Sequence, residues 1–135
     1  MSVEENKEVF CQFYDRAWNM GDVTVVDELL APDFVNHEIE SATTQSHREL
    51  YKQGIIETYK TFPDWRTTIN DLIAERDKVV MQWEASGTHI GEGIGELSGM
   101  QIRYIGISIV RIVDGKITNF WKKDNSCSVL QQFTS

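Results

Sequence analysis

The chain has 135 residues, the length of one domain that can bury a hydrophobic core without disulfides or a structural metal. Hydrophobic residues make up 41%, charged residues 25%, and there are only 2 prolines, a composition typical of a folded globular protein and not of a disordered one. The 21 acidic side chains outnumber the 13 basic ones, so the formal net charge is -8. A field of this sign repels phosphate backbones and anionic lipid headgroups, so nucleic acid and membrane surfaces are not expected as partners.

The amino terminus has no basic patch followed by an apolar run, and no stretch approaches the ~20 apolar residues that a membrane-spanning helix needs. We therefore expect a cytoplasmic protein. Cys11 and Cys127 lie near opposite ends of the chain and form no CxxC pair. A disulfide framework is therefore not expected, and both thiols are interpreted as reduced structural residues.

The first part of the sequence has helical spacing. Ser2 and Glu5 form a capping box, which predicts the start of a helix that ends at Gly21. Asp22 can cap a second, shorter helix that Pro32 ends, and residues 34–37 then form a short extended segment. The inner face of the first helix carries apolar and aromatic residues, namely Val9, Phe10, Phe13, Tyr14, Ala17 and Trp18.

A third helix is expected to begin near Thr44 or Ser46 and to break at Pro63, after which the pattern changes to that of strands. The strands are expected over residues 66–74, 78–89, 101–112 and 116–123, with a hairpin turn at residues 114–115. This order predicts one α+β domain over residues 1–135, in which helices pack on a strongly curved, mostly antiparallel sheet. Such a cone encloses an internal pocket between the sheet and the helices.

Several segments, in this order and spacing, resemble the SnoaL-like polyketide cyclase family. They are WNMGD at 18–22, LAPDFVNH at 30–37, FPDW at 62–65, GTHIGE at 87–92, RIVDGKI at 111–117 and LQQ at 130–132, together with Trp83 and Trp121. The resemblance implies the cone-shaped fold shared with ketosteroid isomerase, scytalone dehydratase and nuclear transport factor 2. It also implies sheet-to-sheet homodimers and cofactor-independent acid–base chemistry in secondary metabolism.

The resemblance also implies where the proton carrier lies. Family members have an aspartate four residues after the tryptophan of the last strand, and this position is Asn125 here, while a second family acid corresponds to Asn119. An amide can bind an oxygen but cannot carry a proton at neutral pH. Asp124 is one residue away, and in an unbulged strand it would face away from Asn125 and Trp121. Either a bulge turns Asp124 inward, or another group is the base, or the pocket only binds.

The candidate catalytic residues are therefore His37, His89, Asp124 and Asn125. Both histidines end strand-like segments and could face a cavity, and histidine is a natural general base at cellular pH. The structural alternative is that each is a hydrogen-bonded histidine without a catalytic role. His47, by contrast, is expected to face solvent, as are the carboxylates of residues 38 and 40.

A flat hydrophobic substrate of polyketide or terpenoid type is expected to contact aromatic side chains, with Ser108 as a hydrogen-bond donor. The alternative for each aromatic residue is plain core packing. On this interpretation the indole of Trp121 and the imidazole of His89 face the pocket, and Ile105, Ile107 and Ile109 bury one strand face against helices or a second subunit. The expected substrate-binding residues are Tyr14, Trp18, Trp65, Trp83, Tyr104, Ser108 and Trp121.

Other chemistries find no support in the sequence. There is no HExxH or HxH pair for a metal, no GxSxG, and no glycine-rich loop followed by a helix, so neither a metal nor a cofactor is expected. The favoured hypothesis is a small cyclase or isomerase that moves a proton on a hydrophobic substrate. The alternatives are an epoxide-opening hydrolase, a scaffold dimer without a pocket, and a binding module that has lost catalysis.

Overall fold

The computed structural model describes residues 2–40, 42–90 and 99–126. The strands form one sheet in the order β1-β5-β4-β3-β2, in which β1 runs parallel to β5 and every other pair is antiparallel. None of the helices in these ranges is long and apolar enough to cross a membrane. The elements are α1 (Val3–Trp18), α2 (Thr24–Leu29), β1 (Leu30–Asn36), α3 (His47–Thr61), β2 (Arg66–Glu75), β3 (Lys78–Thr88), β4 (Gln101–Val113) and β5 (Lys116–Asp124).

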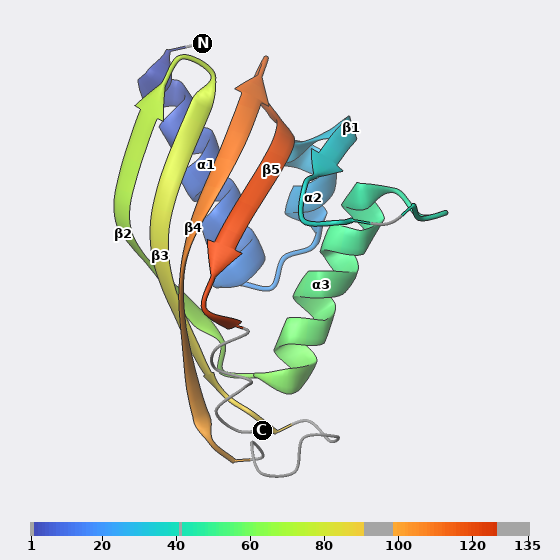
Figure 1. Cartoon of the computed structure of the whole chain (residues 1–135), viewed down its shortest axis with the longest axis vertical. Helices are drawn as coiled ribbons and strands as arrows, with labels where there is room; N and C mark the ends of the chain where they lie inside the picture. Colours follow the sequence, from blue (N-terminus) through green and yellow to red (C-terminus); the bar gives the residue numbers. More distant parts are fainter. Residues whose placement is uncertain (1, 41, 91–98, 127–135) are drawn as a thin grey trace.

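The helices cover one face of a curved, open sheet (Figure 1). α1 runs behind β3 and β4 in this view, and α3 lies beyond β5, so the concave face is roofed while the opposite face has no helix on it. The core between these layers joins side chains from all three helices to the inward-facing residues of the sheet. This arrangement confirms the predicted α+β fold. Fully buried core residues include Phe10, Phe13, Val25, Val26, Ile55, Val79, Met81, Val110 and Ile117.

The helix starts follow the predicted capping signals. The Ser2 hydroxyl accepts a hydrogen bond from the Glu5 N–H at 3.1 Å, and the Glu5 carboxylate accepts one from the Ser2 N–H at 3.2 Å. The Ser46 hydroxyl accepts from the Glu49 N–H at 3.1 Å and begins α3. The β4–β5 hairpin turns at Asp114, with φ 52°, followed by a glycine with φ 78°, as predicted.

The predicted boundary between the second helix and the extended segment is wrong. β1 already begins at Leu30, before Pro32, and α2 has only 6 residues. The reason is tertiary: Leu30 lies opposite Ile117 in the parallel β1–β5 pair, and both side chains are buried in the core. Proline is compatible with this edge strand because its missing N–H is not required on the open side.

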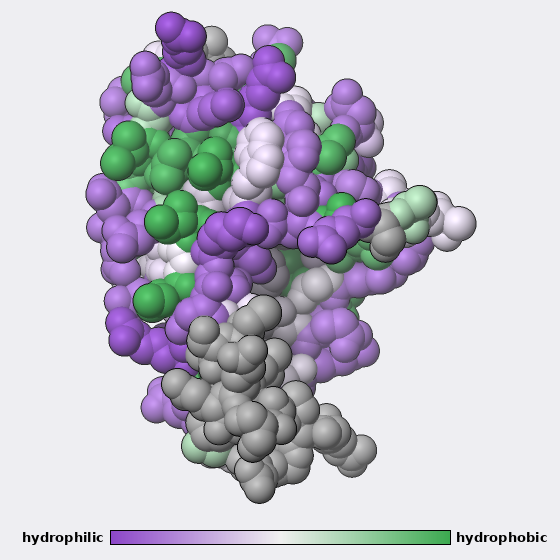
Figure 2. Space-filling view, viewed as in Figure 1, coloured by the Kyte–Doolittle hydropathy of each residue, from purple (hydrophilic) through white to green (hydrophobic). Residues whose placement is uncertain are grey.

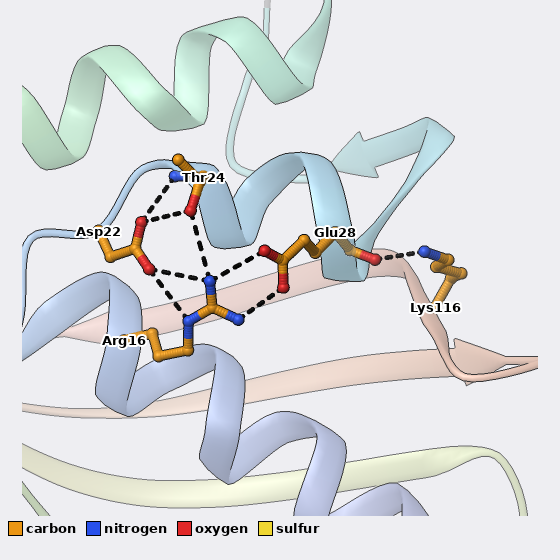
Figure 3. A network of polar contacts seen from close by, with 5 residues as sticks. All are labelled: Arg16, Asp22, Thr24, Glu28 and Lys116. Carbon is orange, nitrogen blue, oxygen red and sulfur yellow. Dashed lines mark hydrogen bonds and ion pairs between the residues drawn. The ribbon is translucent and has the colours of Figure 1, made fainter.

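A polar network joins the end of α1 to α2 and to the start of β5 (Figure 3). Arg16 donates to Asp22 at 2.9 Å and to Glu28 at 2.6 Å, which ties the end of α1 to α2. Asp22 in turn accepts from the Thr24 N–H at 3.0 Å, and the Lys116 ammonium donates to the carbonyl of Glu28. The network therefore holds α1, α2 and the start of β5 together.

β5 contains a β-bulge that decides which of its side chains face the helices. Ile112 of β4 lies opposite Ile117, whereas the next residue, Arg111, lies opposite Asn119, so Thr118 is the extra residue. Ile117 and Phe120 are consequently both buried although they are three residues apart. After the bulge, even-numbered residues of β5 face the helices and odd-numbered residues face outward.

The outer face of the sheet carries an exposed apolar patch (Figure 2). On β4, Ile105 and Ile107 are 48% and 47% exposed, and on β2 Ile73 is 59% exposed. In the single chain Ile105 and Ile107 are therefore not buried against helices. Isolated exposed aliphatics are common, but several of them on one face of a sheet, here on β2 and β4 with β3 between, are typical of an interaction surface.

Candidate functional site

A cavity of about 390 Å³ lies between the helices and the concave face of the sheet. Its volume falls within the range of small-molecule sites, and its walls combine eight aromatic residues with eight polar or charged ones. Residues of α1, α3 and all five strands line the cavity. The lining residues are Tyr14, Trp18, Asn36, Glu38, Leu50, Tyr51, Gly54, Thr58, Phe62, Trp65, Thr67, Trp83, Tyr104, Ser108, Phe120, Lys122, Asp124 and Ser126.

On the side of the cavity formed by the helices, aromatic side chains of α1 and α3 contact one another. The Trp18 indole N–H donates to the Tyr51 hydroxyl at 2.8 Å, and the two rings meet edge to face at 5.8 Å. Burial raises the pKa of Tyr51, which the Trp18 hydrogen bond only partly opposes. Burial, together with the neighbouring Tyr51, likewise raises the pKa of Tyr14. Both phenols are therefore neutral across the physiological range and can act only as hydrogen-bonding groups.

The sheet wall is organised around Trp83. Its indole N–H donates to the buried Ser108 hydroxyl at 2.9 Å, and its ring lies over Gly106 of β4. A Cβ at Gly106 would come within 2.3 Å of the Trp83 ring, so only glycine leaves room for it. Because the Ser108 oxygen accepts from Trp83, its own O–H is oriented by that bond and can donate to a ligand.

A second aromatic group closes the end of the cavity near the β3–β4 hairpin. Phe62 contacts Trp65 at 5.3 Å and Tyr104 at 6.2 Å between ring centroids. Burial first, and then the charge of Asp124, raise the pKa of Tyr104. This phenol is therefore a neutral hydrogen-bond donor that lies close enough to Asp124 to sense its charge.

Asp124 supplies a carboxylate to the cavity wall. Its Oδ1 accepts from the Ser126 N–H at 3.0 Å and from the Ser126 hydroxyl at 2.6 Å, and its Oδ2 lies 3.4 Å from the Lys122 ammonium. Burial raises the pKa of Asp124, but the bonds from Ser126 and the charge of Lys122 together outweigh it, so the pKa lies below its ordinary value. The group is ionised at neutral pH and can accept a proton.

Six of the seven expected substrate-binding residues line this cavity, and the seventh does not. Trp121 faces outward, where its ring stacks on His37 with centroids 4.4 Å apart and planes 3° from parallel. The prediction that the Trp121 indole and the His89 imidazole face the pocket is therefore wrong, and His37, which could have faced it, lies with Trp121 on the outer side. The physical reason is the bulge at Thr118, which reverses the alternation that an unbroken strand would have carried from the buried Ile117. The six lining residues are Tyr14, Trp18, Trp65, Trp83, Tyr104 and Ser108.

The amide positions have structural contacts outside the cavity. The Asn125 Oδ1 accepts from the Ile105 N–H at 2.9 Å and extends the pairing of the strand edge. Asn119 lies on the outer face, with its Nδ2 3.0 Å from the His37 Nε2. Neither amide lines the cavity, so the role expected for Asn125 in polarising a substrate oxygen is wrong. The bulge explains the placement of Asn119, because it sends odd-numbered residues of β5 away from the helices, whereas Asn125 follows the end of β5 and lies beside the β4 backbone.

The other two histidines also have structural surroundings. His89 is 5% exposed and packs edge to face on Phe62 at 5.6 Å between centroids, behind the cavity wall and not on it. Its Nδ1 is buried without a hydrogen-bond partner among the described residues. His47, expected to face solvent, is half-buried because its Nδ1 accepts from the Asn36 N–H at 2.9 Å. Of the four candidate catalytic residues, Asp124 alone lines the cavity.

Sequence reasoning missed Lys122, Ser126 and Tyr51. The alternation of side chains along β5 places Lys122 and Asp124 on the same face of the strand. Only the bulge decides that this face points toward the cavity. Glu38, expected to be solvated, is exposed and lies at the rim of the cavity, while Glu40 is exposed and outside it. Within the described ranges no three metal-binding side chains come together. Cys127 and the segment at 130–132 lie outside the described residues.

Comparison with solved structures finds the same architecture in several proteins. A candidate polyketide cyclase from Acidithiobacillus ferrooxidans is 27% identical, with a TM-score of 0.80 over 98% of this chain and 97% of that chain. IdmH from Streptomyces antibioticus, also described as a candidate polyketide cyclase, is 27% identical, with a TM-score of 0.80 over 96% of this chain and 99% of its own. AclR from Streptomyces galilaeus, described as a candidate hydroxylase, is 27% identical, with a TM-score of 0.78 over 98% and 97%.

No curated protein matches the sequence. The family model for SnoaL-like polyketide cyclases, however, matches residues 8–133, which includes every strand and α1 from Glu8 onward. The family and the solved structures support a cyclase or isomerase type of function. With the cone-like fold, the aromatic cavity and this match in agreement, the chain belongs to the SnoaL-like polyketide cyclase family.

Proposed function

We propose that this protein is a cofactor-independent cyclase or isomerase that moves a proton on a hydrophobic, polyketide-like ketone, with Asp124 as the proton carrier. The observation that carries the proposal is a carboxylate, ionised at neutral pH, on the wall of a cavity that is also lined by eight aromatic residues. Aromatic walls suit a flat ligand, and a carboxylate within them is a proton acceptor protected from bulk water. Tyr14, Trp18, Trp65, Trp83 and Tyr104 would hold the rings of that ligand.

The proposed step begins with proton removal from a carbon next to a carbonyl group. The C–H bond breaks, an O–H bond forms on Asp124, and the electron pair moves to the carbonyl oxygen to give an enolate. In an isomerisation Asp124 returns the proton to another carbon of the same enolate. In a cyclisation the enolate carbon attacks a second carbonyl group of the same molecule, and the resulting alkoxide takes the proton back. Ser108 would donate a hydrogen bond from its hydroxyl group to a substrate oxygen and keep its proton throughout.

Exchange of acidic C–H protons tests the proposal without knowledge of the natural substrate. 2-Tetralone is a flat bicyclic ketone with acidic CH₂ groups, and its proton loss in D₂O is followed by NMR. We expect the protein to accelerate this exchange in proportion to its concentration. Equal exchange rates with and without the protein, at ligand concentrations where binding is measurable, would contradict the acid–base function.

The pH dependence of that exchange follows from the lowered pKa of Asp124. The carboxylate is the active form, so the rate is expected to be constant through neutral pH and to fall only on acidification below the ordinary aspartate range. Ser126→Ala removes the hydroxyl bond to Oδ1, which raises the pKa of Asp124, and the fall is expected to move to higher pH. A pH–rate profile of both proteins checks this. An unmoved profile would show that another group titrates.

The alternative of a binding module that has lost catalysis rested on the two amides. Asn125 and Asn119 have contacts with Ile105 and His37 that lie outside the cavity, so neither amide replaces a carboxylate within it. The observation that favoured the alternative is therefore explained by strand structure. We propose no second function.

We also propose that the protein forms a homodimer through the outer face of the sheet. Beside the apolar patch, Glu84 pairs with Arg103 at 2.7 Å and Asp77 pairs with Arg111 at 2.7 Å. The charges at these places are balanced, whereas the whole chain carries -8. The paired charges reduce the electrostatic repulsion between two copies at this face, and their contact would cover the exposed isoleucines of β4.

A charge in the middle of the patch is expected to separate the subunits. Ile107→Asp would bury a carboxylate without a partner in the dimer, and we expect the monomer mass by analytical ultracentrifugation where the unchanged protein gives the dimer mass. Met20→Asp is the matched control, because Met20 is 67% exposed at the end of α1, away from the outer face. A monomeric unchanged protein, or equal effects of both substitutions, would refute this interface.

A further inference from the structure

Lys122 brings a positive charge into the cavity beside the proton carrier. It lies two residues before Asp124 on the same face of β5, and its ammonium is 3.4 Å from Oδ2. Among the described residues that line the cavity it is the single basic side chain, since the others with charge are Glu38 and Asp124. Its side chain lines the cavity and is 41% exposed, so the ammonium is not enclosed within the wall.

The partners of Asp124 are divided between its two oxygens. Ser126 occupies Oδ1 with two hydrogen bonds, while Oδ2 faces Lys122. The Ser126 contacts hold the orientation of the carboxylate without supplying charge. Lys122 is therefore the group whose electrostatic interaction changes when Asp124 takes up a proton, because protonation removes the negative charge that the ammonium faces.

Proton transfer moves a unit of negative charge over a short distance inside the cavity. Before the step the charge is on Asp124, and after it Asp124 is neutral and the charge is on the substrate oxygen. An ammonium next to both places can remain paired throughout, and this stabilises the charge where it develops. A carboxylate with a lowered pKa is a weak base, so a carbon acid requires such stabilisation of its enolate.

We propose that Lys122 is a second catalytic residue, which binds the enolate oxygen formed when Asp124 removes the proton. This inference rests on the proposed function, since Asp124 takes the proton and Lys122 stabilises the negative charge that the same step creates on the substrate oxygen. The carbon next to the carbonyl group loses its proton to Asp124. The carbonyl oxygen gains the electron pair and becomes the partner of the Lys122 ammonium. The substrate class is thereby narrowed to ketones that bind with the enolisable carbonyl oxygen at the β5 side of the cavity.

The charge state after proton transfer can be reproduced at equilibrium. Asp124→Asn replaces the carboxylate by a neutral group of the same shape, which represents the protonated form. 4-Nitro-1-naphtholate is a flat anion whose oxygen represents the enolate, and 1-nitronaphthalene is its neutral counterpart. Calorimetric titration of both ligands into the Asp124→Asn protein, at a pH where the naphthol is ionised, measures the preference for the anion.

We expect Lys122→Met in that background to weaken binding of the naphtholate by about tenfold or more and to leave binding of 1-nitronaphthalene unchanged. Lys122→Arg should keep most of the affinity for the anion, because it retains the charge. Lys123→Met is the matched control: this neighbouring lysine lies opposite Ile107 on the outer face and should have no effect.

The outcomes separate the two proposals. If both ligands bind but Lys122→Met and Lys123→Met change the preference for the anion equally, the role of Lys122 is refuted while the proposed function stands. If neither ligand binds to the unchanged protein, the proposed cavity for flat ligands fails, and the role of Lys122 fails with it. In 2-tetralone exchange, a normal rate for Lys122→Met beside a lost rate for Asp124→Asn would likewise refute the role of Lys122 alone.

Discussion

Exchanging the residues at 124 and 125 is expected to abolish catalysis although it leaves composition and net charge unchanged. The double variant Asp124→Asn/Asn125→Asp places its carboxylate where the side chain contacts the Ile105 N–H, outside the cavity. We expect 2-tetralone exchange to fall by about a hundredfold or more, as much as for Asp124→Asn alone, since general base catalysis contributes about 10²–10⁴.

The double variant distinguishes two positions for the proton carrier: residue 124, as the structure places it, and residue 125, as counting along the family pattern implies. If the inward position were 125, the double variant would be at least as active as the unchanged protein. Circular dichroism of each variant serves as the control, because Asn125 also extends the pairing with β4 and a folded variant is required. A double variant with full exchange activity would overturn the assignment of Asp124.

Gly106→Ala is expected to destabilise the protein and to disturb the cavity floor. The new Cβ would lie 2.3 Å from the Trp83 ring, so the indole must move, and overpacking of this kind costs about 1–3 kcal/mol. Movement of the ring also breaks the bond from Trp83 to Ser108, and an unpaired buried donor costs about 1–3 kcal/mol. We expect a lower free energy of unfolding in urea and weaker binding of 1-nitronaphthalene.

Two matched substitutions separate these contributions. Ser108→Ala removes the hydrogen-bond acceptor and leaves the space above Gly106 unchanged, so it should show only the second cost. Gly54→Ala has nothing within 4 Å of its new Cβ and lies inside α3, so it should stabilise the protein by up to about 1 kcal/mol. A Gly106→Ala protein as stable as the unchanged one would show that Trp83 does not require this close approach.

Much of the fold could be predicted from local patterns. The capping residues Ser2 and Ser46 fixed the starts of α1 and α3, and alternation with turn residues indicated four of the five strands. β1 was predicted only in part, as an extended segment at 34–37, and its earlier start at Leu30, before Pro32, depends on its pairing with β5. Helix caps and hairpin turns depend on neighbours in sequence, and for that reason a sequence shows them.

The aromatic character of the cavity was also determined by the sequence, because a cone roofed by helices gathers the inward side chains of α1, β3 and β4. What only the tertiary structure decided is the orientation of β5. The extra residue Thr118 is accommodated because Ile117 and Phe120 are both buried against partners far away in the chain. One inserted residue exchanges the two faces of a strand, so these long-range contacts brought Lys122 and Asp124 inside and left Trp121 with His37 on the outer surface.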